Sequence, residues 1–327
     1  MLEIIESLPQ QLINAKDFRI DVERKPFRRV IIAGMGGSAI SGDVVRDILD
    51  GVDFSIEVVR NYSIPSYASA EDTLFIAISY SGNTEETLSA FHQAQERNLE
   101  TAVITSNGTL EQEATRRGLP VIKIPSGYPP RGSLGWLVGA LLKVLEGYGL
   151  ISNANELLES TSRFLREVEQ ELKGEESISF DIANKFYRRF PIVYVPEDMK
   201  SVAMRWQAQI NENAKQLVHT HTLPEMNHNE INGILHPQDV ISRSWVVFLR
   251  DSHTHERIKK RIEITRKIIE ENVMGTDVLE SKGETRMQRI FYLIWMGDFV
   301  SYYLALFNRE DPIEIPRISY LKNSLKD

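Results

Sequence analysis

The segment FIAISYSGNTEET, residues 75–87, passes from an apolar run into a polar run of helix-forming residues. Its start has the apolar, β-branched character of a buried strand, and residues 84–98 have helical spacing. The turn between the two holds three hydroxyl residues and a glycine, namely Ser79, Ser81, Thr84 and Gly82. Open α/β sheets bind ligands where the carboxyl end of a strand leads into a helix. The segment therefore predicts a strand–helix unit of an α/β fold with a ligand-binding turn.

The rest of the first half repeats this alternation of strand and helix. Strand-length, β-branched runs occupy residues 29–34, 55–60, 73–79, 101–106 and 120–125, and stretches with helical spacing occupy 38–49, 84–98 and 109–118. Such a βαβ rhythm is typical of a parallel sheet with helices on both faces. We expect an α/β fold of this type.

The second half returns to the same rhythm after a long helical region at 134–172 and a surface linker at 173–179. Strands are expected at 190–196, 217–222, 240–250 and 276–281, helices at 199–216, 255–272 and 285–307, and a short closing helix from residue 318. The 327 residues suffice for two domains of about 150 residues each. We predict two α/β domains of similar plan, residues 1–150 and residues 151–327.

The composition is that of an ordinary globular protein, with 42% hydrophobic and 26% charged residues. The chain has no cysteine, which excludes disulfides and thiolate zinc sites and fits a cytoplasmic location. A formal net charge of −8 disfavours nucleic acid as a partner. We expect no membrane-spanning segment, and we expect the N-terminal 18 residues to form an amphipathic helix rather than a signal peptide.

The glycine loop GMGGSAISG, residues 34–42, follows one predicted strand and opens a helix. Its G-x-G-x-x-A pattern raises a dinucleotide-binding hypothesis, which requires an acidic residue at the end of the next strand to bind the ribose. Arg60 and Asn61 stand there instead, so a nicotinamide cofactor is disfavoured, although Arg60 suits a 2′-phosphate. A tight turn that only lets the helix pack is the structural alternative.

The hydroxyl turn at residues 79–84 favours a phosphate group. Free N–H groups and the positive end of the helix dipole attract an anion at a helix N-terminus. Asn83 and Glu86 resemble a capping box, but a cap explains only one of the polar residues. Hydroxyl groups hold a phosphate monoester without placing a fixed cation in a site that must release its ligand. We therefore expect a phosphate ester at this turn.

Two motifs, GMGGSAISGD (34–43) and SYSGNTEET (79–87), resemble the signatures of the sugar isomerase (SIS) phosphosugar-binding domain. The whole chain resembles the bifunctional phosphoglucose/phosphomannose isomerases. The resemblance implies two SIS domains, a C-terminal helix folded over the site, a homodimer and no cofactor. It also implies metal-independent interconversion of glucose 6-phosphate, and of mannose 6-phosphate, with fructose 6-phosphate through a cis-enediol. The phosphate and sugar contacts that it implies are Gly37, Ser38, Ser79, Ser81 and Thr84.

Aldose–ketose isomerisation needs a base that moves a proton between two carbons, an acid–base pair that opens the ring, and a cation for the enediolate. Glu212, in INENAK, lies near the end of an apolar helical face, where a partly desolvated carboxylate would have a raised pKa. Composition alone favours a solvated glutamate, whereas the resemblance implies that Glu212 is the base. His228, in the loop sequence PEMNHNE, is implied to open the ring across the dimer interface.

Arg131, in YPPRGSLGW, follows two prolines that stiffen the chain, and its guanidinium suits an enediolate oxygen. The alternative is a surface arginine near a helix start, where positive charge is unfavourable. Lys322, in the closing ISYLK helix, looks like a solvated lysine, but the resemblance implies that it assists ring opening. One departure concerns DPIEIP, where Ile313 and Ile315 stand where the family commonly has a threonine. This departure puts activity on mannose 6-phosphate in doubt.

A histidine-rich segment, HTHTLPEMNHNEINGILH (219–236), raises a metal-site alternative. His219, His221 and Glu225 fit the H-x-H-x-x-x-E metal motif of the cupins, and such ligands would make a plausible zinc site. A cupin, however, is all-β, and its second metal motif has no counterpart here. We therefore predict no metal. Two further alternatives remain: a phosphosugar-binding regulator without chemistry, and an isomerase of another sugar phosphate.

Overall fold

The computed structural model describes residues 1–325, which form two compact units. The N-terminal unit comprises residues 6–167 and 283–290. The C-terminal unit comprises residues 1–5, 168–282 and the described residues from 291 onward. The chain passes from one unit to the other four times: after residue 5, inside helix α7 (Ala154–Leu172), after residue 282, and inside helix α12 (Arg286–Asn308).

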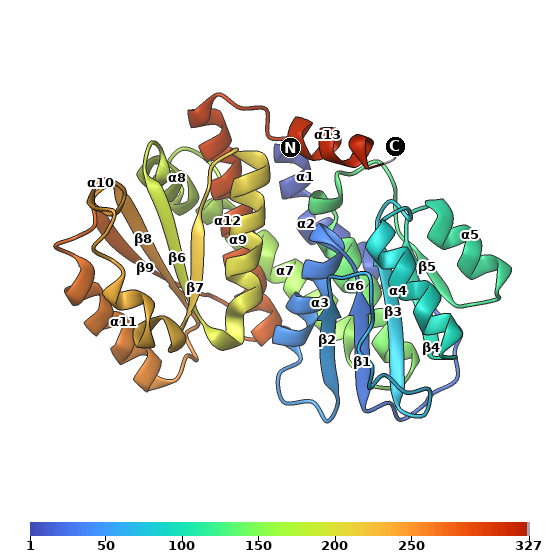
Figure 1. Cartoon of the computed structure of the whole chain (residues 1–327). Coiled ribbons are helices and arrows are strands. Elements are labelled where there is room, and N and C mark those ends of the chain that lie inside the picture. The colour runs from blue at the N-terminus through green and yellow to red at the C-terminus, as the bar shows by residue number, and fades with distance from the viewer. Residues whose placement is uncertain (326–327) are drawn as a thin grey trace. The chain divides into compact units, whose positions relative to one another are not determined.

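The sheet of the N-terminal unit has five strands in the order β2-β1-β3-β4-β5 (Figure 1). Its strands are β1 (Arg29–Ala33), β2 (Ser55–Val59), β3 (Thr73–Ser79), β4 (Glu100–Thr105) and β5 (Val121–Lys123). All neighbouring pairs are parallel, as the sequence predicts. Every residue of β3 is buried, because this central strand is covered on both faces.

Helices cover both faces of this sheet. They are α2 (Leu8–Ala15), α3 (Gly36–Ile48), α4 (Glu85–Glu96), α5 (Gly108–Arg116) and α6 (Leu134–Gly147). One face packs Phe75 and Val103 against Phe91 of α4 and Leu110 of α5. On the other face Gly42 of α3 lies so close to the sheet that an added Cβ would be 3.0 Å from the Val58 side chain.

The C-terminal unit has a four-stranded sheet in the order β7-β6-β8-β9, again with all pairs parallel. Its strands are β6 (Phe190–Pro196), β7 (His219–Leu223), β8 (Ser244–Arg250) and β9 (Gly275–Glu280). Its helices include α1 (Leu2–Glu6), α8 (Ile178–Phe186), α9 (Lys200–Asn213), α10 (Gln238–Ile241), α11 (Glu256–Ile269), most of α12 and α13 (Pro316–Ser324). The strand order repeats the β2-β1-β3-β4 part of the first sheet, so the two units share one plan.

Several element boundaries differ from the expectations. The N-terminal amphipathic segment forms two helices, α1 and α2, with Ser7 between them. The expected strand at 240–250 begins only at Ser244, because α10 occupies its first residues. The expected linker at 173–179 ends in α8, whose N-cap, Ser177, accepts a hydrogen bond from the backbone N–H of Phe180.

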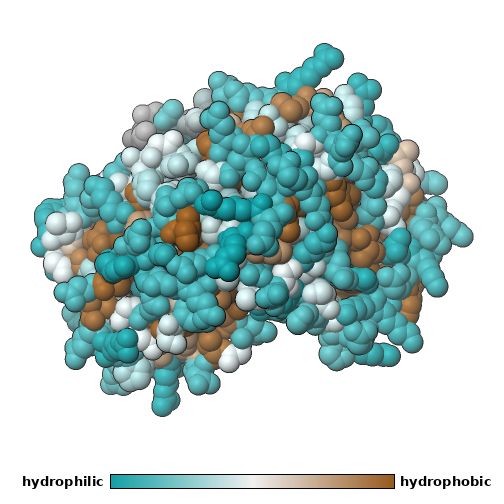
Figure 2. Space-filling view, turned by 180° about the vertical axis from the view of Figure 1, so that it is seen from behind, coloured by the Kyte–Doolittle hydropathy of each residue, from teal (hydrophilic) through white to brown (hydrophobic). Residues whose placement is uncertain are grey.

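Helix α12 bears on the expectation that no segment spans a membrane. By length and composition alone, α12 is long and apolar enough to cross one. The protein buries 83% of the apolar window of this helix, as a soluble protein buries a core helix. The surface in Figure 2 is mainly hydrophilic, and its hydrophobic residues form small groups among hydrophilic ones. We therefore treat α12 as a core helix.

Candidate functional site

The two sequence motifs meet at the carboxyl ends of β1 and β3. The chain runs from β1 to β2 on one side and then returns to β3 on the other side of β1. A crevice opens at such a switch of strand order, and α/β proteins bind ligands there. The glycine loop follows β1, the hydroxyl turn follows β3, and the backbone N–H of Tyr80 donates to Ser38 Oγ at 3.2 Å. The structure thus brings Ser38 to the hydroxyl turn.

The hydroxyl turn has hydrogen-bonding capacity left for a ligand. Ser79 Oγ and Thr84 Oγ1 are 3.0 Å apart and share one hydrogen bond, which leaves one of their two hydroxyl protons for another acceptor. Ser81 Oγ accepts from the backbone N–H of Asn83 at 3.3 Å, so its own proton remains available. Ser79 is buried, Thr84 half-buried and Ser81 exposed. These three hydroxyl groups are neutral donors, with exposure that increases from Ser79 to Ser81, at the carboxyl end of β3.

Gly82 allows the turn to contact the neighbouring loop after β4. Its φ is +68°, and a Cβ added to it would lie 1.7 Å from the carbonyl oxygen of Asn107. On the other side Gly108 has a φ of +87°, and its added Cβ would lie 2.4 Å from the carbonyl oxygen of Ser81. The two loops therefore pack backbone against backbone, and only glycine meets both requirements.

The capping-box interpretation of Asn83 and Glu86 is wrong. The Asn83 Oδ1 atom accepts hydrogen bonds from the backbone N–H and from the hydroxyl of Thr109, both at 3.0 Å. Thr84 occupies the N-cap position of α4, and within residues 1–325 no side chain caps that helix. Asn83 therefore ties two loops together and leaves the first N–H groups of α4 for an anion.

The glycine loop presents a second helix N-terminus. Helix α3 begins at Gly36, and no side chain of the described chain caps it. A Cβ on Gly37 would lie 2.8 Å from the carbonyl oxygen of Pro130, so the glycine admits the loop that carries Arg131. Arg131 is only 3% exposed. The Gln11 side chain holds this loop by donating to the carbonyl oxygen of Gly132 at 2.8 Å.

Arg60 does not have the surroundings that a 2′-phosphate site requires. Its guanidinium pairs with Asp43 of α3, which is buried and also contacts Arg46 at 3.1 Å. The positive charge of Arg60 is therefore paired with a carboxylate of α3. This pairing disfavours the dinucleotide hypothesis and gives Arg60 a structural role between β2 and α3.

The predicted base, Glu212, lies half-buried in the last turn of α9 in the C-terminal unit. Contacts between α9 and α12 fix this helix. Arg205 forms a two-fold hydrogen-bonded ion pair with Asp298, at 3.0 and 2.9 Å, and both side chains are buried. Asn213, next to Glu212, donates to Ser301 Oγ at 2.9 Å. The backbone that carries Glu212 is therefore held in register on the core helix.

His228 is the last residue of a 3₁₀ turn, η3 (Glu225–His228), and it is exposed. Two residues further on, Glu230 is bound by Tyr194 Oη and by His219 Nε2, the latter at 2.9 Å from each carboxylate oxygen. Burial raises the pKa of Glu230, but the hydrogen bonds from His219 and Tyr194 outweigh it and lower that pKa below its ordinary value. The hydrogen bond to Glu230 raises the pKa of His219 against the effect of burial.

The three side chains of the metal-site alternative form hydrogen bonds with three different partners. His219 contacts Glu230, the His221 Nδ1 atom accepts from the Thr222 N–H at 2.7 Å, and Glu225 accepts from Asn229 at 2.9 Å. Among residues 1–325, no three histidine, aspartate or glutamate side chains are grouped to hold a metal ion. The structure therefore does not assemble the cupin-like ligand set.

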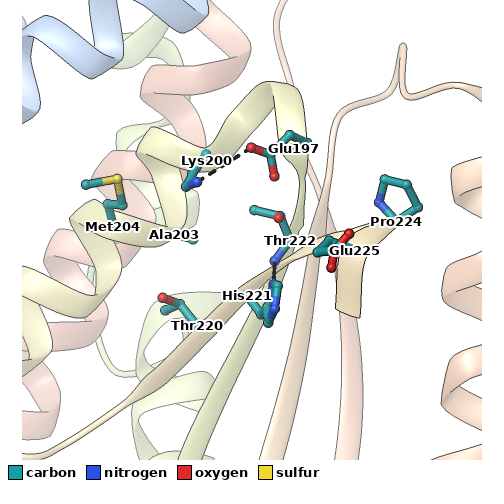
Figure 3. A pocket seen from close by; sticks show the side chains of 9 residues that line it. All are labelled: Glu197, Lys200, Ala203, Met204, Thr220, His221, Thr222, Pro224 and Glu225. Atoms are coloured by element: carbon teal, nitrogen blue, oxygen red, sulfur yellow. Dashed lines mark hydrogen bonds and ion pairs between the residues drawn. The ribbon is translucent and has the colours of Figure 1, made fainter. Parts of the chain in front are cut away.

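The same region lines a cavity of about 600 Å³, shown in Figure 3. Its lining residues are Glu197, Lys200, Ala203, Met204, Thr220, His221, Thr222, Pro224 and Glu225. Lys200 and Glu197 form an ion pair across 3.6 Å, and Glu225 adds a second carboxylate to the lining.

Lys322 lies on α13, where none of residues 316–324 is buried. Ile313 is 48% exposed, and its N–H donates to Asp311 at 2.7 Å. Three residues outside the predicted set support it in the structure: Glu230, Tyr194 and Gln11. The sequence signal for Glu230 is its place two residues after His228 in the NHNE run. Nothing in the sequence around Tyr194 or Gln11 indicates their partners.

Comparisons with known proteins point to one family. Residues 26–118 match the model described as "SIS domain", and residues 175–325 match "Bacterial phospho-glucose isomerase C-terminal SIS domain". A bifunctional phosphoglucose/phosphomannose isomerase of Caldicellulosiruptor bescii is 36% identical over 100% of this chain and 99% of its own. A bifunctional phosphoglucose/phosphomannose isomerase of Aquifex aeolicus is 35% identical over 92% of this chain and 91% of its own. The structure of tagatose-6-phosphate ketose/aldose isomerase from Escherichia coli aligns with a TM-score of 0.69. The alignment covers 95% of this chain and 93% of that one, at 15% identity. The two matched ranges lie on either side of the predicted domain boundary at 150/151, which stays a prediction.

Proposed function

Because the chain belongs to the bifunctional phosphoglucose/phosphomannose isomerase family, we propose that it interconverts glucose 6-phosphate and mannose 6-phosphate with fructose 6-phosphate. The observation that carries this proposal is the meeting of the glycine loop and the hydroxyl turn at the carboxyl ends of β1 and β3. Two uncapped helix N-termini and several neutral donors converge there. That combination suits a dianionic phosphate monoester.

In this proposal the phosphate and sugar are held by the backbone of Gly37 and by the hydroxyls of Ser38, Ser79, Ser81 and Thr84. Three features support it. The hydroxyl turn keeps protons for a ligand, the first turns of α3 and α4 offer N–H groups, and Asn83 locks the turn to its neighbour. A preorganised anchor of this kind leaves the carbonyl end of the sugar for the chemistry.

We assign the proton transfers to Glu212, His228 and Lys322, and the stabilisation of charge to Arg131. His228 and Lys322 open the ring. Glu212 then takes the proton from C2 of the open-chain aldose and returns it to C1, while a proton passes from O2 to O1. The enediolate carries negative charge between these two transfers, and Arg131 offsets that charge. The reaction redistributes hydrogen within one molecule, so it balances without a cofactor.

The proposal includes a cytoplasmic homodimer in which His228 serves the neighbouring site. The exposure of His228 at the end of η3 supports this, since an exposed imidazole can reach a second copy. The proposal includes neither nucleic acid nor a membrane as a partner. The position of Ile313 and Ile315 concerns only breadth toward mannose 6-phosphate, because the proton-transfer residues are unaffected by that departure.

The test uses purified protein with EDTA and each hexose 6-phosphate in turn. We expect turnover in the presence of the chelator, and a loss of about 100-fold in kcat for Glu212→Gln, the scale of a general base. Glu263→Gln is the matched control, because Glu263 is an exposed helix glutamate of the same unit, 50% exposed as a side chain. The control variant should keep wild-type activity.

Three outcomes would contradict the proposal in different ways. Near-wild-type activity of Glu212→Gln would remove the assigned base. Binding of hexose phosphates without turnover would favour a phosphosugar-binding regulator. Turnover of a different sugar phosphate alone would favour an isomerase of another substrate.

A further inference from the structure

The loop at residues 224–233, here called the histidine loop, carries His228 and is held against the sheet of the C-terminal unit by one carboxylate. Both oxygens of Glu230 lie 2.9 Å from His219 Nε2 on the edge strand β7, and Tyr194 Oη on β6 also donates to Glu230. His221 Nε2 is 3.9 Å from Glu230. Donors from two adjacent strands therefore converge on a single side chain of the loop.

Apolar and polar contacts hold the histidine loop at other points. Met226 is fully buried in the core cluster that also contains Phe248 and Tyr194. The Asn227 side chain donates to Thr265 of α11 at 2.8 Å. His228 and Asn229, between these anchors and Glu230, are exposed, and His228 is the one imidazole among them. The loop thus presents one imidazole from an otherwise anchored backbone.

We propose that Glu230 is a positioning residue, which fixes the histidine loop through Tyr194 and His219 and so holds His228 where it opens the sugar ring. The proposal rests on the function proposed above. A partly desolvated carboxylate is stabilised when its oxygens accept hydrogen bonds, so Glu230, whose side chain is 21% exposed, favours the loop conformation that is seated on the two strands. Because the loop is already ordered before the reaction, the reaction step does not carry the entropy cost of ordering it.

The anchor responds to pH. The groups that face the Glu230 carboxylate are Tyr194 from β6 and His219 and His221 from β7, while the backbone N–H of Glu230 donates to Asn229 Oδ1. Because the pKa of His219 is raised, its proton is retained above the ordinary value and is lost as the pH rises through the raised pKa. Because the pKa of Glu230 is lowered, its negative charge is lost only as the pH falls below the ordinary range. The charged pair therefore exists between these two pKa values.

The first test is a double-mutant cycle on turnover of glucose 6-phosphate. We expect Glu230→Gln to lower kcat about 10-fold and His228→Gln to lower it about 100-fold, with KM little changed in both variants. If Glu230 acts through His228, the double variant should be no slower than His228→Gln alone. His92→Gln is the matched control, since His92 Nε2 pairs with Glu113 at the same 2.9 Å, outside the histidine loop.

The second test measures hydrogen exchange of residues 224–233 without substrate. Glu230→Gln and Tyr194→Phe should speed exchange in the loop, and His92→Gln should not. Tyr194→Phe removes only a hydroxyl and keeps the ring that packs 5.3 Å from Phe248, so this variant should fold. In the wild type, loop protection should fall as the pH rises through the raised pKa of His219. His219→Gln should abolish that dependence.

Multiplicative losses in the double variant, or loop exchange that is unchanged in both Glu230→Gln and Tyr194→Phe, would overturn the proposal. The two tests separate it from the proposed function. If the wild type does not isomerise hexose phosphates, the proposed function fails, while the exchange experiment still decides whether Glu230 anchors the loop. If the wild type is active and the exchange is unchanged, only the role of Glu230 is lost.

Discussion

At the scale of single residues, glycine and hydroxyl groups shape the predicted phosphate site. At Gly82 the neighbouring loop approaches closely, and its Asn107 carbonyl oxygen occupies the space of a Cβ. Gly82 therefore acts on the site by letting two loops support each other, and Asn83 and Thr109 complete that support.

We expect Gly82→Ala to lower the free energy of unfolding by roughly 3 kcal/mol or more, because the steric clash adds to the strain of positive φ. Gly51→Ala is the control, since Gly51 has a φ of +86° and an added Cβ there meets no atom within 4 Å. The control should lose only the strain of about 1–2 kcal/mol. Urea unfolding of both variants measures the difference, and equal losses would show that the loop contact is unimportant.

A second residue-scale prediction compares two threonines that are three positions apart. Thr84→Val should raise KM for hexose 6-phosphates about 10-fold, the equivalent of one hydrogen bond to a charged group. Thr87 is buried on α4, and within the described chain its hydroxyl has no hydrogen-bond partner. Thr87→Val should therefore leave KM unchanged and stabilise the fold slightly. Steady-state kinetics decide this, and an unaltered KM in Thr84→Val would exclude that hydroxyl from the site.

At the scale of elements, the α9–α12 pair determines where Glu212 lies. Three polar contacts link the helices: Arg205 with Asp298, Trp206 Nε1 with the Leu293 carbonyl oxygen at 2.8 Å, and Asn213 with Ser301. Gly297 admits the Trp206 ring, because an added Cβ would lie 2.3 Å from Trp206 Nε1. These contacts can form together only when the two helices pack in one register.

Arg205→Met should destabilise the protein by about 3–5 kcal/mol, because it leaves the Asp298 carboxylate buried without its partner. The double variant Arg205→Met/Asp298→Leu should recover most of this stability, since no charge then remains buried. Denaturant unfolding measures both. If the double variant is as unstable as the single one, packing rather than charge compensation dominates at this position.

At the scale of the whole molecule, two units repeat one arrangement of parallel strands, and the C-terminal unit contains two partly buried glutamates whose pKa values are lowered. The C-terminal unit contains Glu171, which accepts from Lys282 and Tyr292, each at 2.6 Å, and Glu230 with its donors. Burial raises the pKa of Glu171, but these hydrogen bonds outweigh it and lower that pKa. In both glutamates a lowered pKa means stability that is present above the ordinary pKa and is lost as the pH falls through the lowered value.

We therefore expect the C-terminal unit to lose stability as the pH falls below the ordinary pKa of a glutamate side chain. Hydrogen exchange resolved by unit, recorded from pH 7 downward, would show this as earlier loss of protection in β6 and β7. Glu171→Gln/Glu230→Gln should flatten that pH dependence. Loss of protection that is equal in both units, or unaffected by the double variant, would contradict it.

Much of the fold follows from local patterns. The strands from β1 to β9 and the helices between them lie close to the predicted ranges, because β-branched runs and helical spacing are properties of short segments. The structure brings Ser38 to the hydroxyl turn, since parallel strands place their carboxyl ends at one edge, while the contact of Ser38 with phosphate or sugar stays a prediction. Boundaries such as the start of β8 were missed, because a short helix and a strand share the same apolar residues there.

The sequence by itself determined the alternation of elements, the two motifs and the residue types that suit a phosphorylated sugar. The tertiary structure alone decided which polar groups are partners: Asn83 with Thr109 rather than Glu86, and Glu230 with Tyr194 and His219. The reason is physical. Periodicity records which face of an element is buried, whereas hydrogen bonds between elements depend on strand order and register, which bring together side chains that are far apart in the chain.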